Sequence, residues 1–210
     1  MTATQATILQ ADKLTFNYPD RPLFSDWSQS IPAGITLVRG GDGRGKTSLL
    51  RLLAGDLAAQ GGQLQLNGIS LAQQAEAYRQ QVFWVHPRSE AFDQMSVPEY
   101  FASVAARYAS FDQSRLPALI AGLSLTPHME KKLFMLSTGS KRKVWQAAAF
   151  ASGAALNLID DPFAGLDQGS INFVTQQLNQ AATEPTRAWV LGMYENPPGV
   201  PLAALIDLGD

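Results

Sequence analysis

The feature that most constrains this chain is a glycine-rich run at residues 40–47, which reads Gly-Gly-Asp-Gly-Arg-Gly-Lys-Thr. It follows Ile35-Thr36-Leu37-Val38, a short apolar stretch typical of a buried strand, and it opens into residues 46–54, whose apolar spacing is helical. Glycines let successive backbone N–H groups converge on one anion, and the start of a helix adds its positive end. In a strand, loop and helix context this spacing predicts a phosphate-binding loop, and a chance match is roughly a one-in-a-hundred event.

The loop supplies most of the predicted binding residues. Lys46 is expected to meet the β and γ phosphates of a nucleotide, and the hydroxyl of Thr47 is expected to ligate Mg²⁺, a hard cation that prefers oxygen. The predicted binding residues of this segment are Gly40, Gly41, Asp42, Gly43, Arg44, Gly45, Lys46, Thr47 and Ser48.

A second candidate is Asp160, which follows the short apolar strand predicted at Leu156–Ile159. The carboxyl ends of parallel strands are where α/β folds place ligand chemistry, so Asp160 is expected to hold Mg²⁺ directly or through water. Taken alone, Asp160 and Asp161 would be interpreted as a solvated acid pair at a strand end. The phosphate loop in the same chain favours the metal-binding interpretation.

The order of the other segments predicts the fold class. Antiparallel strands are expected between Ile8 and Val38, residues 89–136 read as helices broken by prolines, and strands alternate with helices from Leu156 to Leu208. This order predicts an α/β P-loop NTPase with a largely parallel sheet core, an N-terminal antiparallel β subdomain and an inserted α-helical lobe. We expect one domain over residues 1–210, with 1–88 and 149–210 as core and β subdomain and 89–148 as the lobe.

Composition excludes more than it indicates. The net charge of -2 provides no general field that would attract nucleic acid, so no nucleic-acid partner is expected. The chain has no cysteine, which excludes disulfides and thiol catalysis. Residues 1–12 lack an export signal, and no window of ~18 uninterrupted apolar residues occurs, so the sequence predicts a cytoplasmic protein that does not span a membrane.

From Leu14 to Leu208 the chain resembles the ATP-binding cassette family, so the expected nucleotide is ATP. Tyr18 falls where the family places an aromatic ring against adenine. Residues 136–140, Leu-Ser-Thr-Gly-Ser, resemble the family's signature Leu-Ser-Gly-Gly-Gln, in which Ser137 and Gly139 would face the γ phosphate bound by the opposite subunit. Thr138 and Ser140 depart from that pattern.

The stretch from Asp161 to Asp167 resembles the family's segment that runs from the catalytic carboxylate to a loop meeting its counterpart across a dimer. Plainer interpretations stay open beside the family roles. Tyr18 reads equally as an ordinary surface or core tyrosine, and Ser137 and Asp167 read as N-caps of the helices that follow them.

Three positions depart from the family's hydrolytic pattern. Asp161 stands where the family has a glutamate base, Tyr194 stands where it has a switch histidine, and Pro87 or Arg88 replaces a glutamine. A general base must come within ~3 Å of the water it activates, so a shorter arm lowers the rate. The resemblance therefore implies Lys46, Asp160 and Asp161 as the catalytic set, with strong ATP binding and slow or partner-dependent hydrolysis.

The resemblance implies an ATP-binding subunit that couples Mg-ATP-driven dimer closure to a separate transmembrane permease, peripherally at the inner face of the cell membrane. The compact length and the Asp-Pro-Phe after Asp160 are similar to the small haem-exporter type of cassette. The resemblance is compatible both with a homodimer and with a heterodimer that contains another cassette subunit. The alternative function is a soluble nucleotide-gated regulatory or structural switch with little hydrolysis. A phosphate-loop kinase would leave residues 136–140 and Asp167 without a role.

Overall fold

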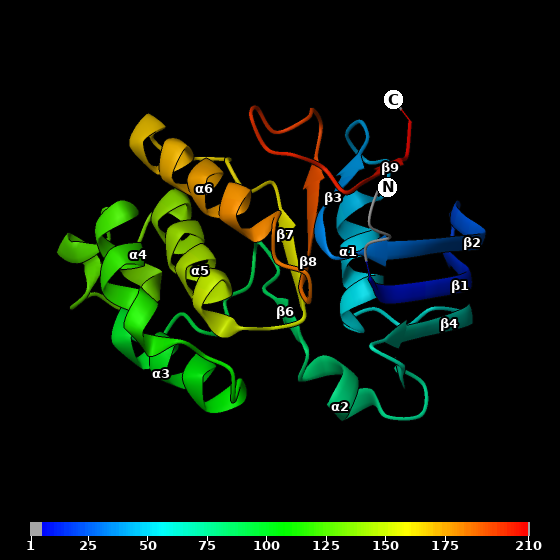
Figure 1. Ribbon diagram of the computed structural model, residues 1–210, viewed down its shortest axis with the longest axis horizontal. Coiled ribbons are helices and arrows are strands. Elements are labelled where there is room, and N and C mark those ends of the chain that lie inside the picture. Colours follow the sequence, from blue (N-terminus) through cyan, green and yellow to red (C-terminus); the bar gives the residue numbers. More distant parts are fainter. Residues whose placement is uncertain (1–5, 210) are drawn as a thin grey trace.

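The computed structural model describes residues 6–209 and places their strands in two sheets (Figure 1). An antiparallel sheet has the order β2-β1-β4-β5, and a five-stranded sheet has the order β6-β7-β8-β3-β9. The first part of the segment 1–12, where no export signal is expected, lies outside the described residues. The strands are β1 (Thr7–Tyr18), β2 (Arg21–Pro32), β3 (Gly34–Arg39), β4 (Gly61–Leu66), β5 (Ile69–Ser70), β6 (Val82–Trp84), β7 (Leu156–Asp160), β8 (Ala188–Met193) and β9 (Ala204–Asp207).

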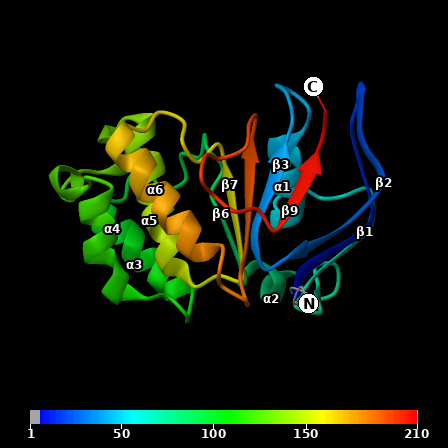
Figure 2. The same ribbon diagram turned by 45° about the horizontal axis from the view of Figure 1, so that its top comes forward.

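Four of the helices form a lobe on one side of the five-stranded sheet, and a helix of nine residues lies on the other side (Figures 1 and 2). The α-helices are α1 (Lys46–Ala54), α2 (Ala75–Arg79), α3 (Val97–Arg107), α4 (Leu116–Gly122), α5 (Thr138–Ser152) and α6 (Gln168–Ala181), and the 3-10 turns are η1 (Gln113–Arg115), η2 (Thr126–His128) and η3 (Leu133–Met135). Figures 1 and 2 both show α3, α4, α5 and α6 gathered beside β6, β7 and β8, with α1 and the antiparallel sheet on the opposite side.

Every strand pair of the five-stranded sheet is parallel, which confirms the predicted core. Alternate residues of a strand point to opposite faces, and β8 shows this plainly. Trp189 and Leu191 pack in the core beneath the helical lobe, whereas Ala188 and Val190 pack against α1 and the antiparallel sheet. A sheet buried on both faces explains why its strands read as continuous apolar runs.

The helical lobe is confirmed, but its prolines begin helices and do not break them. Pro98 lies in the first turn of α3, after a capping box between Ser96 and Glu99. Pro117 occupies the first turn of α4 in the same way. The first helical positions need no N–H donor, so proline is well accommodated there. The division of the chain at residue 149 stays a prediction, and α5 runs across it.

The N-terminal hairpin is longer than its sequence pattern predicts, because β1 and β2 each contain 12 residues. Tyr18 pairs with Arg21 across a turn at Pro19 and Asp20, as expected for that dipeptide. This turn brings Tyr18 and Arg21 to the glycine loop. Within residues 6–209 we find no helix with the length and apolar character needed to cross a membrane.

Candidate functional site

The glycine loop begins where β3 ends and leads directly into α1. Gly43 and Gly45 have φ angles of 76° and 100°, a left-handed region that side chains disfavour. A Cβ on Gly45 would also lie 2.9 Å from Leu23 Cδ1, so a side chain there would require the Leu23 side chain to shift. The first N–H groups of α1 have no partner within the helix and are therefore available to an anion.

Lys46 and Arg21 hold the loop through its carbonyl oxygens. Lys46 Nζ donates to Gly40 O at 2.5 Å and to Gly41 O at 2.9 Å. Arg21 Nη2 donates to Gly43 O at 2.6 Å from the hairpin turn. The N–H groups of Gly40, Gly41 and Arg44 donate to the carbonyls of Met193, Gly209 and Gly41. An anion would therefore meet the other N–H groups of the loop and of the first turn of α1.

Asp160 meets Thr47 at the head of α1. Thr47 Oγ1 donates to Asp160 Oδ2 at 2.5 Å, which joins the first turn of α1 to the carboxyl end of β7. Gly192 of β8 lies between them, and a Cβ there would come within 3.1 Å of Asp160 Oδ1. The structure thus brings together the two residues predicted to ligate Mg²⁺.

Burial is the main influence on the Asp160 carboxyl. Desolvation raises its pKa, the hydrogen bond from Thr47 opposes that rise, and the charge of Asp161 adds to it. Lys46 acts in the lowering direction but more weakly. A partly buried carboxylate beside a hydroxyl, with little local positive charge to balance it, is a suitable ligand pair for a hard cation.

A cavity of about 790 Å³ opens in front of these groups, which is large enough for a nucleotide. Tyr18 stands at its rim, 41% exposed, with its hydroxyl 3.1 Å from Ser48 Oγ. The lining includes the predicted residues Tyr18, Asp42, Gly43, Gly45, Lys46, Thr47, Ser48, Asp160 and Asp161. Gly40 and Gly41 are buried behind the loop, and Arg44 is exposed outside that lining.

The three departures from the family pattern also converge on this cavity. Pro87, Arg88 and Tyr194 all line it, and Tyr194 is 61% exposed. His86 lines it as well, although it does not occupy the position of a switch histidine in the chain order. Both candidate replacements of the family's glutamine therefore line the cavity.

Ser137 and Gly139 do not line the cavity, and their contact with a nucleotide of the opposite subunit stays a prediction. Ser137 caps α5, because its Oγ accepts the N–H of Ser140 at 3.1 Å. Asp167 caps α6 in the same way, accepting the N–H of Ser170 at 2.9 Å. A hydrogen bond from Lys143 and that cap hold the Asp167 pKa well below its usual range. Both N-cap interpretations are confirmed.

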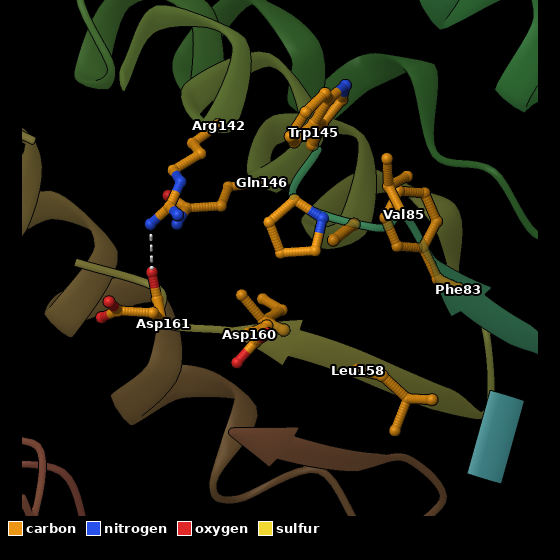
Figure 3. Close-up of a pocket in the computed structure, with 11 residues that line it drawn as sticks. Phe83, Val85, Arg142, Trp145, Gln146, Leu158, Asp160 and Asp161 are labelled. Carbon is orange, nitrogen blue, oxygen red and sulfur yellow. Dashed lines mark hydrogen bonds between the residues drawn. The ribbon is translucent and has the colours of Figure 1, made fainter. Parts of the chain in front are cut away.

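A smaller cavity of about 30 Å³ lies beside Asp160 and Asp161 on the helical side of β7 (Figure 3). Phe83, Val85 and Leu158 form its apolar wall, and α5 contributes polar side chains. Figure 3 shows the guanidinium of Arg142 reaching the backbone carbonyl of Asp161. This cavity is too small for a nucleotide. Its lining residues pack behind the carboxyl end of β7, which carries Asp160.

Several residues that line the site were not predicted from the sequence, and two of them, Arg21 and Arg142, make hydrogen bonds that shape it. Arg21 contacts the loop, and Arg142 lines both cavities. The only signal for Arg142 was its place in the basic run Lys141-Arg142-Lys143, which follows the signature-like segment. Arg21 carried no signal beyond its position after the Pro19-Asp20 turn.

Together the fold and the site define a P-loop nucleoside triphosphatase with an added antiparallel sheet and a helical lobe. The family model described as "ABC transporter" matches residues 24–164. This match covers more than half of the chain, and the chain therefore belongs to the ABC transporter family. The expected fold, ATP binding and class of transporter ATP-binding subunit are confirmed, and the kinase alternative is not supported.

Two relatives illustrate the likeness. The ABC-type transporter ATP-binding protein EcsA of Bacillus subtilis (strain 168) is 28% identical over 179 residues, which are 83% of this chain and 72% of EcsA. The cytochrome c biogenesis ATP-binding export protein CcmA of Pseudomonas savastanoi pv. phaseolicola (strain 1448A / Race 6) is 32% identical over 78% of this chain and 77% of its own length. The second likeness confirms the expected similarity to small export cassettes.

Solved structures agree on the fold. The ATP-binding subunit of an ABC transporter superposes with a TM-score of 0.79 at 24% identity, covering 89% of this chain and 79% of that subunit. A putative ABC transporter ATP-binding protein from Pyrococcus furiosus gives 0.76 at 21% identity, covering 95% and 96%. At these identities the likeness establishes the fold alone.

The raised pKa of Asp160 predicts a pH-dependent cost to stability. The folded state holds this proton more tightly than the unfolded state, so the stability from this group is present at low pH and is lost as pH rises through the raised pKa. We therefore expect Asp160→Asn to raise the free energy of unfolding near neutral pH without nucleotide. The gain should shrink as the pH falls toward the unfolded value of about 3.9. Urea unfolding at a series of pH values measures it.

Asp112→Asn is the matched control, because hydrogen bonds from Ser114 lower the pKa of Asp112. Its substitution should therefore act in the opposite direction near neutral pH and lose its effect as the pH falls. An Asp160→Asn protein that is less stable than the original chain at every pH would contradict the assignment.

Proposed function

We propose that this chain binds Mg-ATP in the cavity in front of α1 and hydrolyses it slowly, as one of a pair of subunits coupled to a transmembrane permease. The observation that carries the proposal is the Thr47–Asp160 hydrogen bond of 2.5 Å at the head of α1, inside a cavity of about 790 Å³. The backbone N–H groups that would bind phosphate, the Thr47–Asp160 pair that would ligate the metal, and the ring of Tyr18 at the rim all lie on one concave surface.

The residues present fit Mg²⁺. Thr47 and Asp160 supply oxygen ligands, and Mg²⁺ in nucleotide sites is usually held by one or two carboxylates together with substrate phosphates. Within residues 6–209 there is no cluster of three or more acidic or histidine ligands, and such a site does not need one. When bound, the ion would neutralise charge on the phosphate oxygens.

The other binding roles follow from position. Lys46 exchanges its bonds with Gly40 and Gly41 for the β and γ phosphates, to which the ammonium acts as a point charge. The amides from Gly43 to Ser48 surround the phosphates, with the Asp42 side chain in the cavity lining and that of Arg44 outside it. Tyr18 stacks on adenine, with its hydroxyl held near Ser48.

A second subunit completes each site. Ser137 and Gly139 lie at the N-terminus of α5, where a capped helix of 15 residues presents its positive end. They lie outside the cavity of their own subunit, so the γ phosphate that they contact is the one bound by the opposing subunit. Pairing with a second copy and pairing with another cassette subunit both satisfy this arrangement.

Slow hydrolysis follows from the side chains near Asp161. Its carboxylate is one methylene shorter than the glutamate of the family, which places a base farther from the attacking water. The hydroxyl of Tyr194 can donate a hydrogen bond, but a tyrosine cannot act as an imidazole does near neutral pH. Neither Pro87 nor Arg88 provides the amide of a glutamine.

The transmembrane partner is proposed from the relatives. Their names describe a transporter ATP-binding protein and an ATP-binding export protein. By analogy we place this chain peripherally at the inner face of the cell membrane, bound to a permease that carries the substrate path. The second candidate is a soluble nucleotide-gated switch, which the altered residues Asp161 and Tyr194 favour.

Removal of the loop lysine tests the binding site. We expect Lys46→Ala to weaken Mg-ATP binding by about 100-fold, because it removes charge-assisted bonds to two phosphates. Titration calorimetry up to millimolar Mg-ATP measures the affinity. Lys132→Ala is the control, since Lys132 is exposed and does not line the cavity. Equal binding by the Lys46→Ala protein would refute the proposed function.

Lengthening the carboxylate arm tests the hydrolytic deficit. We expect single-turnover hydrolysis well below the ~10 s⁻¹ typical of enzymes, and we expect Asp161→Glu to raise it about tenfold at unchanged ATP affinity. Asp161→Asn should lower it further. A fast original chain, or a glutamate variant no faster than the original, would contradict the role given to Asp161.

Affinity capture separates the transporter from the switch. The tagged chain, used as bait in detergent-solubilised membranes of the organism that encodes it, is expected to retain an integral membrane protein. We expect the Lys46→Ala chain to retain it too, because docking does not use the phosphate loop. Recovery of the chain with only soluble proteins would favour the switch.

A further inference from the structure

One face of α5 is bound to the turn that follows β7. The residues that make this contact are Gly139, Arg142, Lys143 and Gln146. Their spacing of three, one and three residues places them on a single side of a helix. The turn that they contact runs from Asp161 to Asp167 and begins with the shortened carboxylate.

Arg142 makes the bonds nearest to that carboxylate. Its Nη1 donates to Asp161 O at 3.0 Å (Figure 3) and to Ala164 O at 3.2 Å. These two bonds join the first residue of the turn to its middle. Gln146 is 3% exposed, and its amide donates to the carbonyl of Pro162 between them. Side chains of one helix thus occupy three carbonyls of the turn.

The backbone of Asp161 needs this support. Its φ angle is 53°, a left-handed value that is uncommon outside glycine and is tolerated best by Asp and Asn. Its N–H donates to Gly192 O at 2.9 Å, and its carbonyl accepts from Arg142. Because both peptide groups around its Cα are held, the backbone fixes the direction in which the Asp161 side chain leaves the turn.

We propose that Arg142 is a positioning residue for Asp161, which it ties to the helix whose first turn carries Ser137 and Gly139. The inference rests on the proposed hydrolytic role of Asp161. A movement of the first turn of α5, on contact with the opposing subunit's nucleotide, is passed through Arg142 to the carboxylate of its own site. The two sites of a pair are thereby coupled.

Arg142 also lines the nucleotide cavity, so a direct bond to phosphate is the competing role. The two roles differ in kinetics. A phosphate ligand contributes to binding, and its loss raises KM and the ATP dissociation constant. A positioning residue acts on the chemical step, and its loss lowers kcat at constant affinity.

The first test compares two arginines. Arg142→Lys keeps the charge, but the lysine side chain is one atom shorter and its donor falls short of the position that Arg142 Nη1 occupies between the two carbonyls. We expect its single-turnover rate to fall about tenfold, with ATP affinity within about twofold of the original, because a displacement of about 1 Å at a catalytic group has effects of this size. Arg115→Lys is the matched control, since Arg115 also donates to an α5 carbonyl, Phe150 O at 2.7 Å. It should leave the rate unchanged.

The second test asks whether Arg142 acts through Asp161. In an Asp161→Asn background, Arg142→Lys should give no additional loss of rate, because the group that it positions is already removed. Gln146→Met is a second probe, which keeps the buried volume but removes the donor to Pro162. We expect it to lower the rate severalfold, and the loss should likewise disappear in the Asp161→Asn background.

Each of four outcomes would overturn the inference. In the kinetic tests, these are a multiplicative loss of rate in the Arg142→Lys, Asp161→Asn double variant, or an equal loss of rate in the Arg115→Lys control. The others are an ATP affinity of the Arg142→Lys protein that differs from the original by more than about twofold, or an unchanged rate in both the Arg142→Lys and Gln146→Met proteins. Failure of the proposed function looks different. In that case the unaltered chain fails to bind Mg-ATP, or Asp161→Asn hydrolyses ATP as fast as the original.

Discussion

The contact between Thr47 and Asp160 depends on the absence of a side chain at Gly192. The strands β7 and β3 are not neighbours, because β8 lies between them, and the carboxylate must pass over β8 to reach the head of α1. A Cβ at Gly192 would come within 3.1 Å of both Asp160 Oδ1 and Leu50 Cδ1. A side chain at this position of the middle strand would therefore crowd both the Asp160 carboxylate and the packing of α1.

The same geometry costs stability. Asp160 is removed from water without a full charge partner among the described residues, and burial raises its pKa accordingly. A cation held there together with a nucleotide, as proposed above, would offset that cost, because a ligand that binds only the folded state stabilises it.

The sequence predicted the parts of the site that depend on local chain order. The glycine loop, the strand that ends at Asp160 and the capping roles of Ser137 and Asp167 all involve residues within a few positions of one another. The bonds of Arg21 to Gly43 and of Arg142 to Asp161 join residues that are distant in the chain or on separate elements. The periodicity of the sequence does not indicate such a bond, because an arginine on a helix gives the same pattern whether or not it binds a distant carbonyl.

Binding and the proposed slow hydrolysis rely on different parts of the chain, so one can change without the other. The phosphate site is built from backbone N–H groups, whose positions follow from glycine conformation and the start of α1, so it tolerates changes in surrounding side chains. Proton abstraction depends on the reach of a single carboxylate. In the proposed role of Arg142, proton abstraction depends on the backbone as well. Arg142 binds the backbone carbonyl of Asp161 and not its carboxylate. A shortened arm on a fixed turn has little freedom to search for water, which makes the rate depend on where α5 holds the turn.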